Sequence, residues 1–276
     1  MMRYRFIPYL ALLAAMPAAA FAQQASNSVL ACNGTTDYVV ASSALDVTNT
    51  FTIELWVNPT TTHQIDREVA TGYQSGVEGE HYAVYPLHGT AVWGAGHAGV
   101  GISVGTNGIS VYEHAADHMP AVLVYEAPIH GWTHIAVVYQ DRLPTLYVNG
   151  ALARTGLAST MKYVHPSAGL VSGRYVYGGI GGGPFGYFAG MIDDFRVWST
   201  ARSAAEIRQT MTSPAPAGTP GLAVVYDMNR NGAGSGLMVR NGSSQTNNAV
   251  TVGTPSTPVF VAASVTGDTD LQPALK

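Results

Sequence analysis

The sequence predicts an all-β sandwich, and three observations support this fold class. Short runs rich in Val, Ile, Tyr and Thr alternate between apolar and polar residues, which is the period-2 pattern of half-buried strands. Thirty-one glycines and fifteen prolines separate these runs and supply turns, without a collagen-like period. Helical periodicity is almost absent. Because sandwiches of about 200–250 residues often form one domain, a chain of 276 residues is compatible with a single β domain.

The N-terminal segment, residues 1–22, has the features of a secretory signal peptide. Arg3 and Arg5 precede an apolar stretch, and the small residues Ala20 and Ala22 fit a cleavage site. We therefore expect cleavage near Ala22 and a secreted protein, periplasmic or extracellular, and the Ala-rich segment suggests a bacterial source. No later segment reaches 18 continuous apolar residues, so no membrane-spanning segment is expected.

Charge and cysteine content exclude several classes of protein. The net charge of -4 becomes -6 without Arg3 and Arg5, because 11 basic residues then oppose 17 acidic ones. Such a chain lacks the basic footprint of nucleic-acid binding and the polybasic patch that binds anionic membranes. Cys32 is the only cysteine, so no intramolecular disulfide can form. We expect a small buried hydrophobe in the first strand, with lipidation at this position as the alternative.

The strands can be justified in chain order. Residues 51–57 alternate bulky apolar side chains with partly polar ones. Residues 133–139 and 145–148 form two further strands, joined by the loop 140–144. Asn149-Gly150 then makes a tight turn, since both residues tolerate the positive φ of a type I′ hairpin. The sequence therefore predicts a three-stranded meander in the middle of the chain.

One helix is predicted, from Ser203 to about Met211. Ser203 and Glu206 form a capping box, in which each side chain satisfies a backbone N–H at the helix start. A Pro/Gly-rich loop at 212–221 follows, and strands near 222–228 and 248–262 return to the same sandwich. We therefore expect one domain over 23–264 and a C-terminal tail over 265–276.

Five segments, in order, form a further pattern. They are 33–39, 51–59, 131–137 with 146–150, 190–198 with 203–207, and 221–227. Each alone is a weak pattern, but together they span most of the chain and resemble laminin G-like jelly rolls of the concanavalin A-like lectin family, with a distant similarity to pentraxins. The resemblance implies two curved antiparallel sheets with about 12–14 strands in all, packed face to face. It also implies that ligands bind at loops and on the concave face.

Most of the motif residues are expected to be structural. Large aromatic residues within apolar alternation prefer burial, which applies to Trp56, Trp132, Phe195 and Trp198. Asp193 and Asp194 are expected to accept backbone hydrogen bonds in a neighbouring loop. His134 lies in mid-strand beside Trp132 and is expected to be a packed histidine of the core.

The segment 73–130 is the expected location of a ligand site. It is rich in Tyr, His and Glu, and aromatic rings can stack on sugars while carboxylates accept bonds from hydroxyl groups. The alternative is a solvated loop with scattered polar side chains. The candidate ligand-binding residues are Tyr73, Glu80, His81, Tyr82, Trp93, His97, Tyr112, His114 and His118, with Tyr175 and Tyr177 flanking a Gly-rich loop.

A metal site is the sharper hypothesis for the same segment. Glu78, Glu80, His114 and His118 mix carboxylate and imidazole donors, which suits Zn²⁺ or another transition metal, whereas calcium takes oxygen ligands. No spacing matches a defined motif, so no cofactor is expected to be required. A pentraxin-type calcium site is doubtful, because Gly173 is followed by 174–177, Arg-Tyr-Val-Tyr, which cannot chelate calcium.

Three functions remain open at this point. The first is a secreted, non-catalytic module that binds a carbohydrate or cell-surface ligand, with a glycan or a surface protein as partner. The second is a polysaccharide lyase or glycoside hydrolase acting from 73–130; Glu78 and Glu80 have suitable spacing but lie among turn residues. The third is a structural or adhesive protein-binding domain. No nucleophile elbow is present in the sequence, and a fold does not by itself specify a function.

Overall fold

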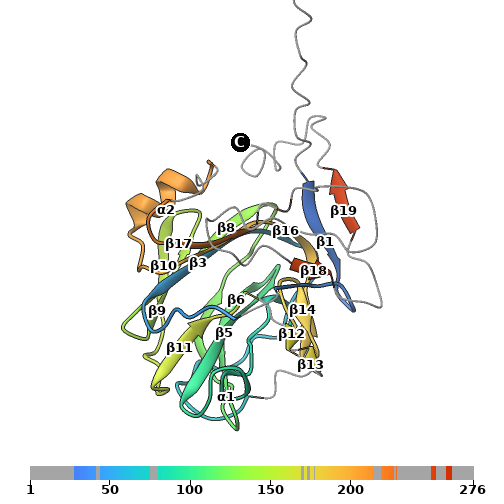
Figure 1. Ribbon diagram of the computed structural model, residues 1–276. Helices are drawn as coiled ribbons and strands as arrows, with labels where there is room; N and C mark the ends of the chain where they lie inside the picture. The colour runs from blue at the N-terminus through green and yellow to red at the C-terminus, as the bar shows by residue number, and fades with distance from the viewer. Residues whose placement is uncertain are drawn as a thin grey trace, which may run out of the picture.

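The computed structural model is a sandwich of two β-sheets (Figure 1). It describes residues 28–41, 44–74, 80–168, 171–172, 175–176, 178–213, 219–226, 228, 250–252 and 259–262. The predicted signal peptide and C-terminal tail lie outside these residues. No helix among them is long and apolar enough to cross a membrane.

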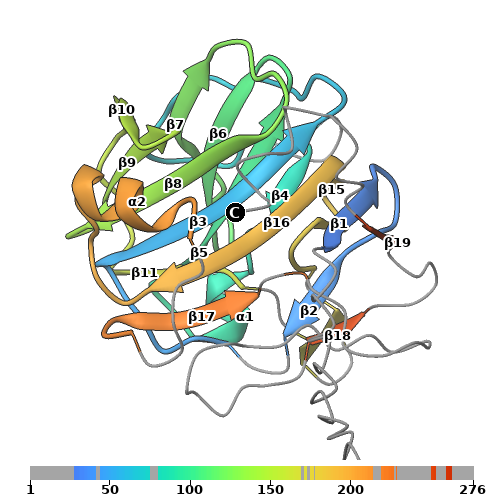
Figure 2. The same ribbon diagram turned by 90° about the horizontal axis from the view of Figure 1, so that it is seen from above.

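The larger sheet has eight strands in the order β10-β9-β8-β3-β16-β1-β19, with β17 also paired to β16. All its pairs are antiparallel. Seen from above, helix α2 (Ala204–Thr210) lies over its outer face (Figure 2). The strands are β1 (Ser28–Asn33), β3 (Phe51–Pro59), β8 (Thr133–Gln140), β9 (Leu143–Val148), β10 (Ala151–Thr155), β16 (Ala189–Trp198), β17 (Leu222–Tyr226) and β19 (Val259–Ala262).

The smaller sheet has five strands in the order β11-β5-β6-β7, with β4 paired to β5. The resemblance implied antiparallel sheets, but β11 runs parallel to β5. The strands are β4 (Tyr82–Val84), β5 (His97–Gly105), β6 (Gly108–His114), β7 (Ala121–Glu126) and β11 (Tyr163–Pro166).

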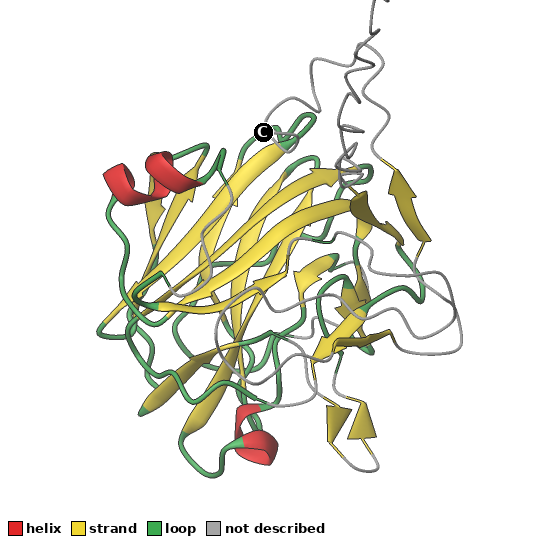
Figure 3. Cartoon of the chain, turned by 45° about the horizontal axis from the view of Figure 1, so that its top comes forward, coloured by secondary structure: helices red, strands yellow, loops and turns green. Residues whose placement is uncertain are grey.

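Short elements lie around the two sheets, and both helices are at the periphery (Figure 3). Helix α1 (Gly89–Val92) was not predicted, since four residues are too few for a periodic signal. The remaining strands form three two-stranded pairs. They are β2 (Val39–Ala41) with β18 (Val250–Val252), β12 (Val171–Ser172) with β13 (Tyr175–Val176), and β14 (Gly182–Gly183) with β15 (Gly186–Tyr187).

The core lies between the inner faces of the two sheets, and alternation along the strands builds it. In β3 the residues Phe51, Ile53, Leu55 and Val57 face inward and are fully buried. Apolar residues of β5 and β6 meet them from the smaller sheet. Apolar burial at about 25 cal/mol per Å² is the main stabilising term, so the period-2 pattern fixes which face of each strand points inward.

The local predictions for the meander and the helix are confirmed. Asn149 and Gly150 both have positive φ, 48° and 73°, and β10 follows as the third strand of the meander. The predicted loop 140–144 is shorter than expected, because Asp141 and Arg142 alone form the turn, also with positive φ. Ser203 and Glu206 complete the capping box of α2.

The motif aromatics and His134 are buried, as predicted, but mostly on the outer face of the larger sheet. Trp56 packs with Trp132, and its indole N–H donates to the Met211 carbonyl at 2.8 Å. His134 packs edge-on against Trp56. These contacts hold the end of α2 against the outer face of the sheet.

Candidate functional site

The outer face of the smaller sheet is covered by the chain itself. We call residues 61–74 and 80–88 the covering segment. A Cβ added to Gly99, Gly101 or Gly105 of β5 would lie 2.3–2.5 Å from atoms of the covering segment. The three glycines therefore allow main chain to lie directly on the sheet, as glycine in a strand often does. Their neighbours in this segment are Leu87, Pro86 and His63.

The covering segment corrects the prediction that two of the candidate tyrosines bind a ligand. Tyr82 and Tyr112 are fully buried and pack edge-to-face with ring centroids 5.6 Å apart, together with Met119 and Ala121. The Tyr112 hydroxyl donates to Oδ2 of Asp66 at 2.9 Å. Both rings hold the covering segment in place, and neither offers a face to a ligand at the surface.

Glu80 lies in the same buried region, with only 1% of its surface exposed. Burial, and then the nearby Asp66 carboxylate, raises the pKa of Glu80 to about 8. Glu80 is therefore mainly protonated at neutral pH. A buried, neutral carboxyl group cannot contact a polysaccharide as it stands, which corrects its assignment as a ligand-binding residue.

The candidate histidines are distributed over several environments. His114 is buried, and its Nδ1–H donates to the Pro86 carbonyl at 3.0 Å; burial lowers its pKa to about 4. His118 is nearly buried, with Nε2 3.8 Å from the Glu113 carboxylate. His81 is half-buried and contacts the Thr61 hydroxyl at 2.8 Å, and burial lowers its pKa.

Two of the other candidates, Trp93 and His97, meet at the ring of His165. Trp93 stacks on His165, with ring centroids 4.1 Å apart, and His97 Nδ1 lies 2.7 Å from His165 Nε2. Tyr73 is 48% exposed and carries the most accessible aromatic ring of the set. Glu78 and Tyr177 lie outside the described residues, as does the side chain of Tyr175.

The structure does not bring the predicted metal ligands together within its described part. Over those residues, no group of three or more His, Cys, Asp or Glu side chains is arranged to hold a metal ion. Of the predicted ligands, His114 bonds the Pro86 carbonyl, whereas His118 lies near Glu113 of β6. Glu113 faces inward, accepting bonds from Tyr139 and Ser159.

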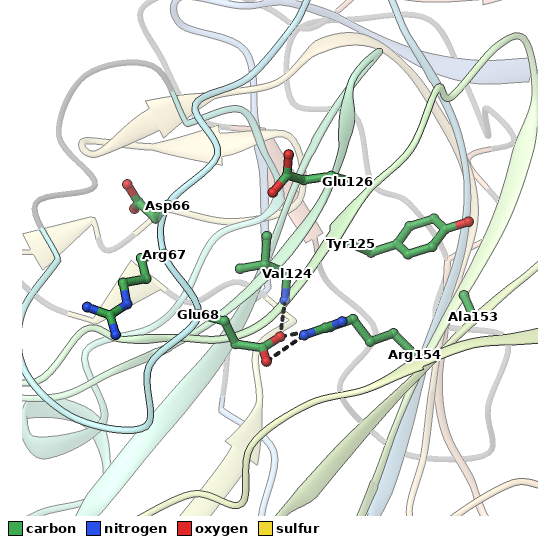
Figure 4. Close-up of a pocket in the computed structure, with 8 residues that line it drawn as sticks. All are labelled: Asp66, Arg67, Glu68, Val124, Tyr125, Glu126, Ala153 and Arg154. Carbon is green, nitrogen blue, oxygen red and sulfur yellow. Dashed lines mark hydrogen bonds and ion pairs between the residues drawn. The ribbon is translucent and has the colours of Figure 1, made fainter.

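A cleft lies where the edge strand of each sheet meets the covering segment (Figure 4). Its volume is about 540 Å³, within the range of small-molecule sites. Strand β7 is the edge of the smaller sheet and β10 the edge of the larger one. The cleft is lined by Asp66, Arg67, Glu68, Val124, Tyr125, Glu126, Ala153 and Arg154.

An ion pair spans the cleft from the covering segment to β10. Arg154 donates to the two carboxylate oxygens of Glu68 at 2.7 and 2.9 Å, and the Val124 N–H donates to Glu68 at 2.9 Å. Burial opposes ionisation of Glu68, but the bonds from Arg154 and Val124 hold its pKa below the usual value. The bidentate geometry fixes both side chains before any ligand arrives.

The remaining lining groups offer different chemistry. Tyr125 is half-buried and packs against the core, and its ring points away from Asp66 and Glu126 (Figure 4). Glu126 is exposed, and Asp66 is half-buried. Figure 4 shows the Arg67 side chain pointing away from Tyr125 and Glu126. The cleft therefore has hydrogen-bond acceptors on one side of β7 and the aromatic ring of Tyr125 on the other.

Most of this cleft was not predicted. Tyr125 falls inside 73–130 but was not among the candidate residues, and Asp66, Arg67, Glu68 and Arg154 lie outside that segment. One signal was present: Asp66-Arg67-Glu68 is a run of three charges in a chain with only 11% charged residues. The pairing of that run with Arg154, 86 positions away, had no local signal.

Comparisons with solved structures give distant likenesses. A candidate carbohydrate-binding protein from Bacteroides ovatus matches at 15% identity and a TM-score of 0.49, covering 86% of this chain and 62% of that one. The chain thus spans less than two thirds of that protein. A heptameric SAP-like pentraxin from Limulus polyphemus matches at 13% identity and a TM-score of 0.49, covering 87% and 98%. These likenesses are too distant to indicate a ligand.

A comparison with curated protein sequences gives no match. A family model, in contrast, matches residues 33–208, which is more than half of the chain. The matched range contains both sheets' central strands and ends within α2. The chain belongs to the concanavalin A-like lectin/glucanases superfamily, as a laminin G-type member.

Proposed function

We propose that this domain is a non-catalytic binding module that recognises a carbohydrate or cell-surface ligand through the cleft between β7 and β10. The observation that supports this proposal is the lining itself, in which Tyr125, half-buried against the core, lines the same cleft as an ion pair held by three hydrogen bonds. A site ordered in advance loses little side-chain entropy on binding, which favours affinity.

The side chains of the cleft match the chemistry of a saccharide. Carboxylate oxygens of Asp66 and Glu126 can accept bonds from sugar hydroxyl groups. The Tyr125 ring and the aliphatic stem of Arg154 can pack on the C–H faces of a sugar ring. Apolar contact with a few placed polar groups is the usual composition of a small-molecule site.

The burial of Glu80 favours binding over hydrolysis. A general acid needs a raised pKa and contact with the leaving group, and Glu80 meets only the first condition because it is 1% exposed. We accordingly propose that the domain does not cleave its ligand. Incubation with uronic-acid and neutral polysaccharides should release neither reducing ends nor the absorbance of unsaturated lyase products, and release of either would contradict the proposal.

We also propose that the protein is exported, on the strength of the signal-like segment 1–22. Fractionation of a bacterial host, with N-terminal sequencing, should find the protein outside the cytoplasm with a new N-terminus near Ala22. An uncleaved cytoplasmic protein would contradict this part of the proposal.

A glycan array followed by calorimetry tests the binding function. For the ligands that bind, Glu126→Ala and Tyr125→Ala should each weaken affinity about tenfold. Tyr73→Ala is the matched control, since Tyr73 is an exposed aromatic outside the cleft lining. Thermal unfolding checks that Tyr125→Ala still folds, and Glu126→Ala changes an exposed side chain only.

The outcomes separate the competing hypotheses. Loss of affinity in Tyr73→Ala alone would move the site to the segment predicted from the sequence. If no glycan binds, and a surface protein is captured instead through Glu126 and Tyr125, the ligand is a protein and the carbohydrate proposal fails.

A further inference from the structure

We infer that the cleft selects saccharides without carboxylate or sulfate groups over their anionic counterparts. This inference rests on the proposed carbohydrate-binding function and names the class of ligand. It follows from which charges of the cleft are already neutralised inside the protein and which remain for a ligand.

The one arginine that projects from β10 is already paired. Arg154 directs Nε and Nη2 at the two oxygens of Glu68, at 2.9 and 2.7 Å. A guanidinium in such a bidentate pair has that edge occupied. An incoming carboxylate or sulfate could use these two donors only by displacing Glu68, which also accepts the Val124 N–H at 2.9 Å. The charge of Arg154 is therefore already balanced by Glu68 within the protein.

Two acidic side chains of the lining keep their negative charge uncompensated. Asp66 accepts bonds from the Tyr112 hydroxyl and the Gln64 amide, at 2.9 and 2.7 Å, and both donors are neutral. Glu126 is exposed. Across the residues that the structure describes, no Lys, Arg or His forms an ion pair with Asp66 or Glu126.

Arg67 is the remaining cation of the lining. Its side chain is exposed and points away from Glu126 and Tyr125 (Figure 4). Beside the neutral Arg154–Glu68 pair, the surface open to a ligand thus carries two carboxylates against one arginine at its margin. The negative charge of Asp66 also affects the buried Glu80, since it contributes to the raised pKa of that carboxyl group.

A ligand in this cleft therefore meets acceptors and a negative potential. Sugar hydroxyl groups can donate to the acceptors without an electrostatic cost. A uronate or sulfate would be placed near like charges, which lowers both affinity and association rate. We expect an anionic saccharide to bind about tenfold more weakly than its neutral counterpart at low salt. The difference should shrink at high salt, where exposed charges are screened.

The test uses the full domain and matched ligand pairs. An array carries neutral backbones beside their uronate and sulfated forms, for example an oligogalacturonate and the same oligomer after carboxyl reduction. Calorimetry at low and high salt then measures each pair that binds. Glu126→Gln keeps the size of the side chain and removes its charge, so it should bring the affinity for the anionic member closer to the affinity for its neutral counterpart.

Asp46→Asn is the matched control. Asp46 is an exposed carboxylate that affects the buried His165 of β11, at the opposite edge of the smaller sheet from β7. It should change neither member of a pair. Equal or tighter binding of the anionic members, or no response to Glu126→Gln, would overturn the charge selection while the binding function stands. Failure of every glycan to bind would overturn the binding function and this inference together.

Discussion

The first prediction concerns the buried ion pair between Glu54 and Arg202, on the outer face of the larger sheet under α2. Arg202 donates to Glu54 at 3.2 Å and also bonds the Thr210 hydroxyl and the Glu206 carbonyl, both at 2.9 Å. Its guanidinium carbon lies 3.8 Å from the Trp198 ring centroid. The side chains of Glu54 and Arg202 are 0% and 7% exposed.

The variant Arg202→Met keeps most of the packing and removes the charge. It leaves Glu54 as a buried carboxylate with less compensation, which costs about 3–5 kcal/mol. For a domain of this size each kcal/mol lowers Tm by about 2–4 °C, so a drop of about 10 °C is expected. Arg154→Met is the matched control. Its pair with Glu68 is shorter, at 2.7 Å, but the side chains are 44% and 18% exposed, and exposed pairs contribute about 0–1 kcal/mol.

The pH dependence gives a second readout of the same variant. Burial raises the pKa of Glu54, although Arg202 and Arg196 oppose the shift. Without Arg202 the folded-state pKa rises further, and stability then falls as pH increases from the unfolded value of about 4.3. The loss in Arg202→Met should therefore be larger at pH 8 than at pH 4.5, as measured by urea unfolding. If Arg154→Met costs as much as Arg202→Met, burial is not the deciding factor and the reasoning fails.

Three further predictions concern buried acids, buried histidines and metal. Because the raised pKa of Glu80 means that the folded state holds its proton up to about pH 8, the contribution of Glu80 to stability should fall as pH rises from about 4.5 to 8. Glu80→Gln should therefore unfold at higher urea than wild type at pH 8.5, and an unchanged midpoint would count against a neutral Glu80. Burial lowers the pKa of His114 and His165 to about 4, so the unfolded chain binds protons first and the contribution of these histidines to stability should fall as pH drops from about 6.5 to 4. His114→Gln should reduce that slope in urea titrations, and an identical slope would refute the assignment. Ligand affinity should be the same in excess EDTA and in added calcium, since no group of three or more His, Cys, Asp or Glu side chains in the described part of the chain is arranged to hold a metal ion; a loss on chelation, measured by calorimetry, would show that a metal takes part.

The features predicted well from the sequence have local causes. The turn at Asn149-Gly150 needs two residues that accept positive φ, and the helix start needs Ser203 and Glu206 three positions apart. Alternation over 51–57 fixes the buried face of β3 without reference to any other strand. Each of these features is determined by a few neighbouring residues, so it can be predicted from a single sequence.

The location of the site depended on contacts between distant segments. The tyrosines at 82 and 112 have the composition of a binding surface, but the covering segment buries them. The relevant signal was in β5, where Gly99, Gly101 and Gly105 lie on one face of a strand that is otherwise apolar. Glycines at alternate positions indicate close approach of another main chain, although they do not identify which segment approaches.

Strand β10 forms the outer edge of the larger sheet, and the position of Arg154 on it affects self-association. An edge strand offers free N–H and C=O groups to a second molecule, and Leu152 of β10 is 63% exposed. The register of β10 against β9 shifts between Leu152 and Arg154. A bulge and a charged residue make an edge a poor template for further pairing. Arg154, which lines the cleft, therefore also hinders pairing of β10 with a strand of a second molecule. Loss of Arg154 should favour aggregation as well as change binding.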